Sequence, residues 1–362
     1  MKMKKFAPVA LWLLSATSAY AQGPDREVWI SLGAETLGPV RAEFQEKGWE
    51  VPAPARETAG VAALRVRESQ LARLSELMHE KFNRCAGFIQ HDSREDALAA
   101  VEGASSFGAA QLVAASYTLD NASVVNALMG GLQEANVRST ITTLSGYTTR
   151  YYTSQSGVNA ANWLKGQWET FAQGRSDISV ELFTHAGWAQ PSVILTIQGA
   201  TQPSEVVVLG GHLDSFNSSG GNAPGADDDA SGIASLTEAL RVALAQGYYP
   251  AKTVKFMAYA AEEVGLRGSS EIATWHKNNG VNVVGVLQLD MTNYRGSSVD
   301  VGIVTDNTNA AQNTFLTNLI DTYVGATWAN TQCGYGCSDH ASWTSKGFPA
   351  SIPFEALMGQ HN

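Results

Sequence analysis

The sequence predicts an α/β protein: a twisted, mostly parallel mixed sheet with helices on both faces, preceded by a small α+β segment. Three short apolar runs of strand length, at 205–209, 253–260 and 283–289, carry this prediction. Apolar residues at helical spacing follow in 233–244, between the first two runs, and helical patterns also occupy 124–135 and 160–171. Strands that alternate with helices form mostly parallel sheets that are covered on both faces.

Length and composition limit the possible classes of protein. The chain has 362 residues, a formal net charge of −10 and 44% hydrophobic residues, which is typical of a globular protein. Its length predicts two domains, or one large domain with an extension. The acidic balance without a Lys/Arg stripe argues against a nucleic-acid partner. No apolar run approaches the ~20 residues that a membrane-spanning helix needs.

The N-terminus has the three parts of a secretory signal peptide. Three lysines within the first five residues precede an apolar stretch at 6–14, and the small-residue site Ala-Tyr-Ala follows at 19–21. We therefore predict that residues 1–21 direct export and are cleaved, so that the protein is extracellular. The alternative, a short buried helix, fits the flanking charges and the Ala-Tyr-Ala ending poorly.

Residues 22–105 are richer in charged side chains than the rest of the chain. Leucines at mostly helical spacing among charges predict an amphipathic surface helix over 64–84. A Gly/Ala/Ser-rich stretch at 103–115 separates this segment from the body, 106–362. A small charged module after a signal peptide suggests a propeptide that is later removed, and the alternative is a small permanent domain.

Polar residues follow each of the three predicted strands. His212 and Asp214 follow the first, Glu262 and Glu263 the second, and Asp290 the third. Because open α/β sheets bind ligands outside the carboxyl ends of their strands, we expect these side chains to converge in one crevice. Each alone has a simpler explanation, such as a structural histidine or a solvated pair of glutamates. Together, mixed imidazole and carboxylate ligands favour Zn²⁺.

An acidic loop at 225–232 precedes the predicted helix at 233–244. Its three adjacent carboxylates, Asp227, Asp228 and Asp229, repel one another unless a cation or a helix N-terminus compensates. Helix capping alone is the simpler alternative, and Ser231 is also eligible for that role. With the strand-end residues nearby, the loop adds candidate ligands to the metal site.

Four segments, at 211–215, 223–232, 260–265 and 289–294, resemble motifs of the secreted bacterial leucyl aminopeptidases, a family of co-catalytic di-zinc exopeptidases. The resemblance covers 118–362. It implies a zinc-dependent aminopeptidase that hydrolyses the N-terminal bond of peptides with a free N-terminus and prefers apolar, leucine-like first residues. Family precursors carry a signal peptide and a propeptide, so the propeptide is expected to act as an intramolecular inhibitor or folding aid.

The resemblance assigns metal ligands residue by residue. Asp228 resembles the carboxylate that bridges both zinc ions. His212 and Asp290 resemble ligands of one ion, and Glu263 resembles a ligand of the other. A pair of zinc ions ~3.5–4 Å apart activates a shared water and polarises the scissile carbonyl.

Two further acids have implied roles beside the metals. Glu262 resembles the general base, which takes a proton from water and passes it to the leaving amine. Glu262 and the neighbouring ligand Glu263 can divide these roles because the strand has ended there. Asp214, two residues after His212, is expected to orient that imidazole as a hydrogen-bond acceptor.

The C-terminal part supplies a loop and a pocket. Cys333 and Cys337 in an exported protein predict a small disulfide better than a zinc site, which recruits four ligands, and the family has a similar bridge. Tyr335 between them resembles a tyrosine that hydrogen-bonds the substrate carbonyl, with packing alone as the alternative. The positions of Met291, Phe354 and Met358 match residues that line the pocket for the N-terminal side chain.

The resemblance departs at the C-terminus. The family's fifth metal ligand is a histidine in an Asn-Pro-x-Ile-His stretch after a Pro-Phe-Glu motif. Here that motif is present at 353–355, and the sequence given stops at His361 and Asn362. The sequence therefore predicts a truncated domain whose second zinc site, at Glu263, lacks one ligand.

Two alternatives share the predicted fold. One is a single-zinc enzyme similar to glutaminyl cyclases, and the other is a non-catalytic binding ectodomain. Glu262 beside four candidate ligands argues for an enzyme, and the acidic loop favours the peptidase. We expect a monomer.

Overall fold

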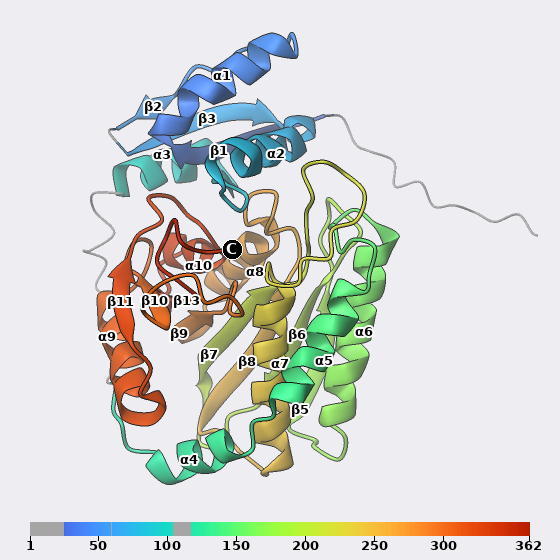
Figure 1. Cartoon of the computed structure of the whole chain (residues 1–362), viewed down its shortest axis with the longest axis vertical. Coiled ribbons are helices and arrows are strands. Elements are labelled where there is room, and N and C mark those ends of the chain that lie inside the picture. The colour runs from blue at the N-terminus through green and yellow to red at the C-terminus, as the bar shows by residue number, and fades with distance from the viewer. Residues whose placement is uncertain (1–24, 59, 104–116) are drawn as a thin grey trace, which may run out of the picture.

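The computed structural model describes residues 25–58, 60–103 and 117–362. They form a small N-terminal module, 25–103, which lies over one end of a larger body, 117–362 (Figure 1). The expected signal peptide at 1–21 and most of the Gly/Ala/Ser-rich stretch lie outside the described residues. Within the described part, no helix is long and apolar enough to cross a membrane.

The module is an α+β unit built on a four-stranded antiparallel sheet in the order β2-β3-β1-β4. Apolar side chains of α1 and α2 pack on one face of this sheet, and α3 packs on the other. The elements are β1 (Glu27–Gly33), η1 (Ala34–Thr36), α1 (Leu37–Glu46), β2 (Arg56–Glu57), β3 (Val61–Arg67), η2 (Glu68–Gln70), α2 (Leu71–Phe82), β4 (Phe88–His91) and α3 (Arg94–Gly103).

The helix predicted over 64–84 is wrong in its first part. Leu64 lies in β3, and the helix α2 begins at Leu71. In β3 the exposed Arg65 and Arg67 alternate with the buried Leu64 and Val66, which is the period of a half-buried strand. Over so few residues, a leucine among charges is compatible with both the helical and the strand repeat. Pairing of β3 with β1 and β2 stabilises the strand.

The body is built on a six-stranded sheet in the order β12-β9-β7-β8-β6-β5. β12, β9, β7 and β8 pair in parallel, and β6 and β5 add antiparallel strands at one edge. The predicted mostly parallel mixed sheet is confirmed, and the three predicted strands are β7, β8 and β9. The strands are β5 (Ile178–Phe183), β6 (Ser192–Ile197), β7 (Gln202–His212), β8 (Lys252–Tyr259), β9 (Asn282–Gln288) and β12 (Ala350–Ser351).

Helices cover both faces of this sheet, as predicted. α6 and α7 contribute Trp168, Ile233 and Leu240 to the core on one face, while α8 and α10 contribute Ile272 and Trp343 to the core on the other. The helices are α4 (Ala122–Gly130), α5 (Glu134–Ser145), α6 (Gln155–Phe171), α7 (Ala230–Ala245), α8 (Arg267–Asn278), α9 (Ala310–Leu319), η3 (Ile320–Val324) and α10 (His340–Ser345).

The helix expected over 124–135 is two helices. α4 ends at Gly130, and α5 starts at Glu134. The adjacent Gly130 and Gly131 have low helix propensity and interrupt an otherwise continuous apolar pattern.

A second, three-stranded sheet flanks the carboxyl end of the main sheet. Its order is β11-β10-β13, with β10 and β11 parallel and β13 antiparallel to β10. The strands are β10 (Val301–Val304), β11 (Trp328–Thr331) and β13 (Pro353–Phe354). Figure 1 shows these strands below the N-terminal module, beside the ends of β7 and β9.

The module packs directly on the segment that follows β8. The backbone N–H of Gln90 donates to Gly265 O at 3.0 Å, and Ser75 Oγ donates to Glu263 O. Farther out, Lys346 Nζ donates to Asp92 Oδ2 at 2.9 Å. The module therefore covers the edge of the sheet at which the sequence places its candidate ligands.

Candidate active site

The candidate ligands meet at the carboxyl ends of three adjacent parallel strands. His212 is the last residue of β7, Glu262 and Glu263 follow β8, and Asp290 follows β9. Each is at most 2% exposed. His212 Nε2 lies 3.5 Å from Asp290 Oδ1 and 2.8 Å from Asp228 Oδ1 of the acidic loop. The structure thus brings the three chain segments and the loop together at one point.

The three aspartates of the acidic loop face different partners. Asp229 caps α7, and both of its carboxylate oxygens accept backbone N–H groups: its Oδ2 accepts the N–H of His212 (3.0 Å), and its Oδ1 accepts those of Gly232 (2.8 Å) and Met291 (3.2 Å). Asp228, in contrast, faces the imidazole of His212. Capping and ligation are therefore divided between neighbouring carboxylates, and Asp228 is the one that remains available to a metal.

Several buried polar atoms of this site lack a hydrogen-bond partner among the described residues. They are both ring nitrogens of His212, both carboxylate oxygens of Glu262, and one oxygen each of Asp228, Glu263 and Asp290. The approach of His212 to Asp228 does not have hydrogen-bond geometry. Buried polar atoms without partners cost free energy. Because imidazole nitrogen and carboxylate oxygen are the ligands that zinc takes in such sites, the residues present fit this metal.

The electrostatics of the site also favour a bound cation. Burial raises the pKa of Glu262 well above its usual range, and burial together with the charge of Asp228 raises the pKa of Glu263 to about 7. For His212, burial lowers the pKa, but Asp290 and Glu262 outweigh it, so the pKa is raised. Such shifts describe excess negative charge in a dry cluster, which a divalent cation neutralises.

Asp214 positions the general-base candidate. Its carboxylate accepts the backbone N–H of Glu262 at 3.0 Å and of Glu263 at 3.2 Å. Its Oδ1 atom also lies 3.5 Å from His212 Nδ1. The expected orientation of the His212 imidazole by Asp214 stays a prediction, because His212 Nδ1 has no hydrogen-bond partner among the described residues. What the contacts do show is that Asp214 fixes the turn that separates the two glutamates.

Comparison with known proteins identifies the family. The model of peptidase family M28 matches residues 192–358, which include every candidate ligand and Glu262. Leucine aminopeptidase 1 of Arthroderma otae is 40% identical over 257 residues, 66% of this chain and 68% of that protein. The chain belongs to peptidase family M28. A probable aminopeptidase of Saccharomyces cerevisiae, YDR415C, is 37% identical over 258 residues, 67% of this chain and 68% of that protein.

A solved aminopeptidase structure extends the likeness to the N-terminal module. The structure of the LapA aminopeptidase of Legionella pneumophila matches this M28 peptidase with a TM-score of 0.77 and 30% identity. The match covers 93% of this chain and 90% of that one, which is more than the body alone. The expected aminopeptidase family and fold are confirmed at this level.

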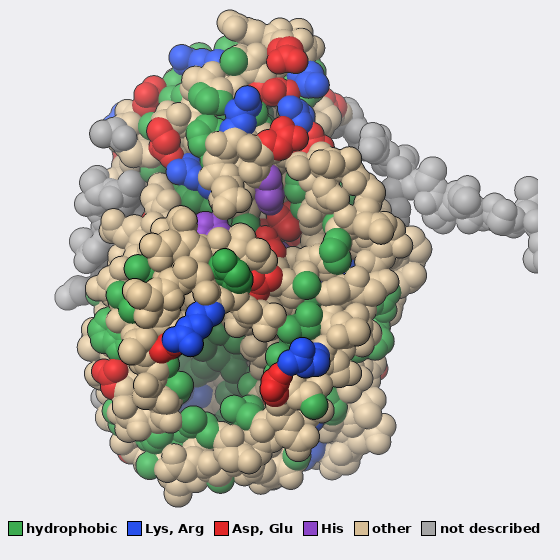
Figure 2. Space-filling view, viewed as in Figure 1, with side chains coloured by type: hydrophobic (Ala, Val, Ile, Leu, Met, Phe, Trp, Pro, Cys, Tyr) green, Lys and Arg blue, Asp and Glu red, His purple; other side chains and the backbone are tan. Residues whose placement is uncertain are grey.

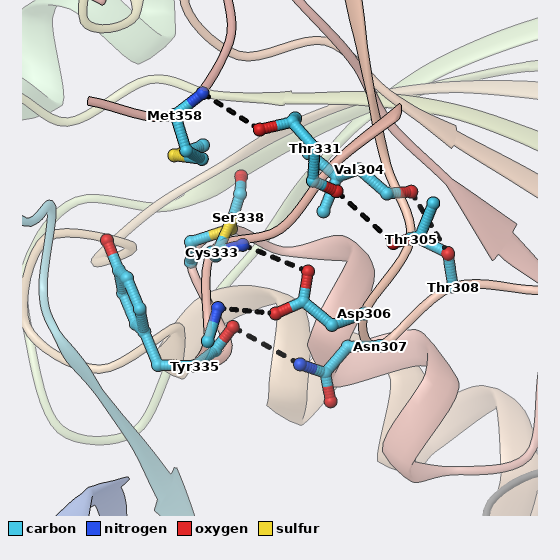
Figure 3. Close-up of a disulfide and its surroundings, with 12 residues drawn as sticks. Val304, Thr305, Asp306, Asn307, Thr308, Thr331, Cys333, Tyr335, Ser338 and Met358 are labelled. Carbon is cyan, nitrogen blue, oxygen red and sulfur yellow. Dashed lines mark hydrogen bonds between the residues drawn. A yellow bond between two sulfur atoms is a disulfide. The ribbon is translucent and has the colours of Figure 1, made fainter. Parts of the chain in front are cut away.

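The predicted disulfide between Cys333 and Cys337 is present in this peptidase. Figure 3 shows how the adjacent backbone is held: Asp306 accepts the N–H groups of Cys333 (3.0 Å) and Gly334 (2.6 Å), and Asn307 Nδ2 donates to Tyr335 O (3.2 Å). The Tyr335 ring points away from both of these anchors (Figure 3). The loop thus presents Tyr335 from a fixed backbone.

The residues expected to form the substrate pocket lie together. Met291, Phe354 and Met358 share one apolar cluster with Tyr335 and the disulfide. The cavity that remains among them is only about 20 Å³. An additional side chain, that of Cys85 from the N-terminal module, is part of the same cluster.

Two residues at the centre were not predicted from the sequence: His79 and Cys85. His79 Nε2 lies 3.2 Å from Glu263 Oε2, and Cys85 Sγ donates to Asp228 Oδ2 at 3.0 Å. A single cysteine outside the disulfide was the one signal available in the sequence. Nothing distinguishes His79 from the other polar residues of an amphipathic helix.

Among the described residues, His79 is the histidine that pairs with Glu263. His361 instead packs edge-on against the Phe354 ring, with centroids 5.6 Å apart. The backbone N–H of Asn362 donates to Glu355 Oε1 at 3.1 Å. His361 therefore does not replace the fifth ligand that the resemblance leads one to expect.

Substitutions of neighbouring aspartates should separate ligation from structure. Asp228→Asn should weaken zinc binding by at least ~10-fold, the lower range for perturbed metal sites, with little loss of thermal stability. Asp229→Asn should lower the free energy of unfolding by roughly 1–3 kcal/mol, because it weakens hydrogen bonds to three buried N–H groups. Zinc per chain and thermal midpoints test both, and normal zinc affinity in Asp228→Asn would contradict the ligand assignment.

Thiol titration checks the cysteine assignments. The chain has three cysteines, so the denatured, unreduced protein should show one reactive thiol, that of Cys85, and three after reduction. Cys85→Ser should show none before reduction. Three thiols without reductant would mean that the disulfide does not form in solution.

Proposed function

We propose that this M28 peptidase is a zinc-dependent aminopeptidase that removes apolar, leucine-like residues from the N-terminus of peptides. The observation that carries the proposal is the carboxylate of Glu262, fully buried and unpaired, beside four metal-type ligands. The names of relatives such as leucine aminopeptidase 1 of Arthroderma otae support the substrate class.

The ligand geometry supports two metal positions that share Asp228. His212 and Asp290 would hold one zinc with it, as their distances of 2.8 and 3.5 Å around His212 Nε2 allow. Glu263 would hold the other. Bound zinc would lower the pKa of a water molecule and polarise the carbonyl of the scissile bond.

Glu262 handles the proton in this proposal. It accepts the proton of the attacking water and transfers it to the amine that leaves. Two features suit it to this role: burial raises its pKa, and Asp214 fixes its backbone without engaging its carboxylate. The apolar cluster of Met291, Phe354 and Met358 would receive the first side chain, and Tyr335 would hydrogen-bond the carbonyl oxygen.

We also propose that residues 1–21 are a signal peptide, that the protein is exported, and that the N-terminal module is a propeptide. The contacts of Ser75 with Glu263 and of Gln90 with Gly265 support this role, because both join the module to the segment that carries the candidate base and ligand. A cover in this position inhibits until it is removed.

Replacing the general base should separate chemistry from metal binding. Glu262→Gln should keep its zinc and lose about 10²–10⁴-fold in kcat, the usual contribution of a general base. Release of a chromogenic amine from leucine anilide, with and without chelator, measures this. The matched control is Glu169→Gln, because Glu169 is half-exposed on α6 and pairs with Lys165. An active Glu262→Gln enzyme would contradict the assignment, and cyclisation of N-terminal glutamine without anilide hydrolysis would favour a glutaminyl cyclase.

Separating the module from the folded body tests its role as a cover. A site-specific protease sequence inserted after Gly103 allows one cut after folding. We expect kcat/KM on leucine anilide to rise at least ~10-fold, which corresponds to a covering free energy above about 1.4 kcal/mol. Uncut protein with the same insertion is the control. Equal activity before and after dissociation of the module would indicate a permanent domain that does not inhibit.

A further inference from the structure

We propose that His79 and Cys85 of the N-terminal module are zinc ligands in the uncut chain. With Asp228 and Glu263 they complete a closed, four-ligand site. This inference rests on the zinc site of the proposed function and adds to it the means by which the module closes that site. The residues concerned lie where the module meets the body, and Figure 2 shows histidine and carboxylate side chains together in the hollow there.

The fold of the module delivers both side chains to one point. His79 lies in the last turn of α2, which ends at Phe82. Asn83 is left-handed, with φ of 51°, and caps the helix. The chain then turns through Cys85 before β4 begins at Phe88. A helix end and the turn after it thus place an imidazole and a thiol beside the ends of the body's strands.

The distances fit coordination of one ion. His79 Nε2 is 3.2 Å from Glu263 Oε2, and Cys85 Sγ is 3.0 Å from Asp228 Oδ2. The donor atoms of His79, Cys85 and Asp228 all lie within 4.8 Å of one another. Ligands that hold zinc tetrahedrally at about 2.0–2.3 Å lie roughly 3–4 Å apart. These three donor atoms are therefore close enough to hold one zinc ion, and Glu263 adjoins them beside His79.

Glu263 gives an independent reason to expect a ligand there. Its side chain is only 2% exposed, and its Oε2 atom has no hydrogen-bond partner among the described residues. The imidazole of His79 lies 3.2 Å from that oxygen, an ion-pair distance without hydrogen-bond geometry. A cation between the two would satisfy both groups.

A second hydrogen bond prepares His79 to be a ligand. Its Nδ1 atom lies 2.9 Å from the backbone carbonyl oxygen of Ser75. A carbonyl only accepts, so Nδ1 carries a hydrogen, and Nε2 is the atom available to a metal. Metal-bound histidines commonly donate their other ring N–H to a backbone carbonyl in this way.

The thiol of Cys85 is suited to bind zinc, and its neighbour Arg84 is anchored by other residues. Thiolate is a strong zinc ligand, and sites with four protein ligands leave no open position for water. Arg84, the neighbour of Cys85, is held by Glu35 at 2.6 Å and lies 4.5 Å from the Tyr335 ring centroid. On binding, an S–Zn bond replaces the S–H bond of Cys85, and the proton passes to solvent.

The same residue blocks the substrate's position. Cys85 packs in the apolar cluster with Met291, Phe354 and Met358, where the cavity is only about 20 Å³. A leucine side chain does not fit in that space. The turn that carries Cys85 would therefore block two sites at once: the open coordination position of the zinc and the pocket for the substrate's first side chain.

Cobalt(II) substitution of the uncut full-length chain tests the assignment without relying on activity. Thiolate bound to cobalt(II) gives a strong near-ultraviolet charge-transfer band. The wild-type chain should show this band, and Cys85→Ser should lose it while remaining folded. Cys85→Ser and His79→Gln should each bind the cobalt at this site at least ~10-fold more weakly. Lys81→Ala, exposed on the same helix, is the matched control and should keep the band.

Alkylation of the single free thiol gives a second measurement. In the folded, zinc-loaded chain we expect Cys85 to react at least ~10-fold more slowly than after zinc is removed with a chelator. A metal-loaded wild-type chain without the band, a band that persists in Cys85→Ser, or equal alkylation rates would each overturn the proposal. Leucine anilide hydrolysis by the cut chain distinguishes failure of this proposal from failure of the proposed function. Activity in the cut chain without a thiolate band in the uncut chain would refute the assignment of Cys85 as a ligand alone. Absence of any metal binding would refute both the ligand assignment and the zinc-dependent function.

Discussion

One buried carboxylate, that of Asp229, sets the geometry on which the rest of the site depends. It accepts N–H groups from the end of β7, the start of α7 and the segment after β9. The first and the last of these segments are distant in sequence, and a candidate ligand lies in or beside each of the three. Because both oxygens of Asp229 already accept backbone N–H groups, Asp228 is the more available of the two carboxylates. Asp214 fixes the segment after β8 in the same way, because its carboxylate accepts the backbone N–H groups of Glu262 and Glu263.

The cost of this arrangement is negative charge in a region without water. His212 and the four acids around it are almost fully buried apart from Asp228, which is about a quarter exposed. Their unpaired atoms would destabilise the body unless a hydrogen-bond donor or a cation took the place of the water lost on burial. In the proposed function, zinc and the imidazole of His79 supply that compensation.

Much of the body follows from local patterns. Apolar runs identified β7, β8 and β9, and the rule that strand ends converge anticipated the meeting of His212, Glu263 and Asp290. Prediction failed where short segments satisfy two periods, as around Leu64, and did not include β5 and β6, whose pairing is antiparallel at an edge. The contact of Cys85 with Asp228 joins residues 143 positions apart. No local pattern encodes such a contact, because it depends on how two separately folded units dock.

That long sequence separation has a thermodynamic consequence. While the chain is continuous, the turn that carries Cys85 meets Asp228 at an effective concentration fixed by the connection, whatever the amount of protein present. After a cut, the same turn belongs to a separate molecule, whose occupancy depends on its own affinity and on dilution. If the module is the proposed propeptide, a single peptide-bond cleavage would thus lower the occupancy of the closed state, and dilution would lower it further.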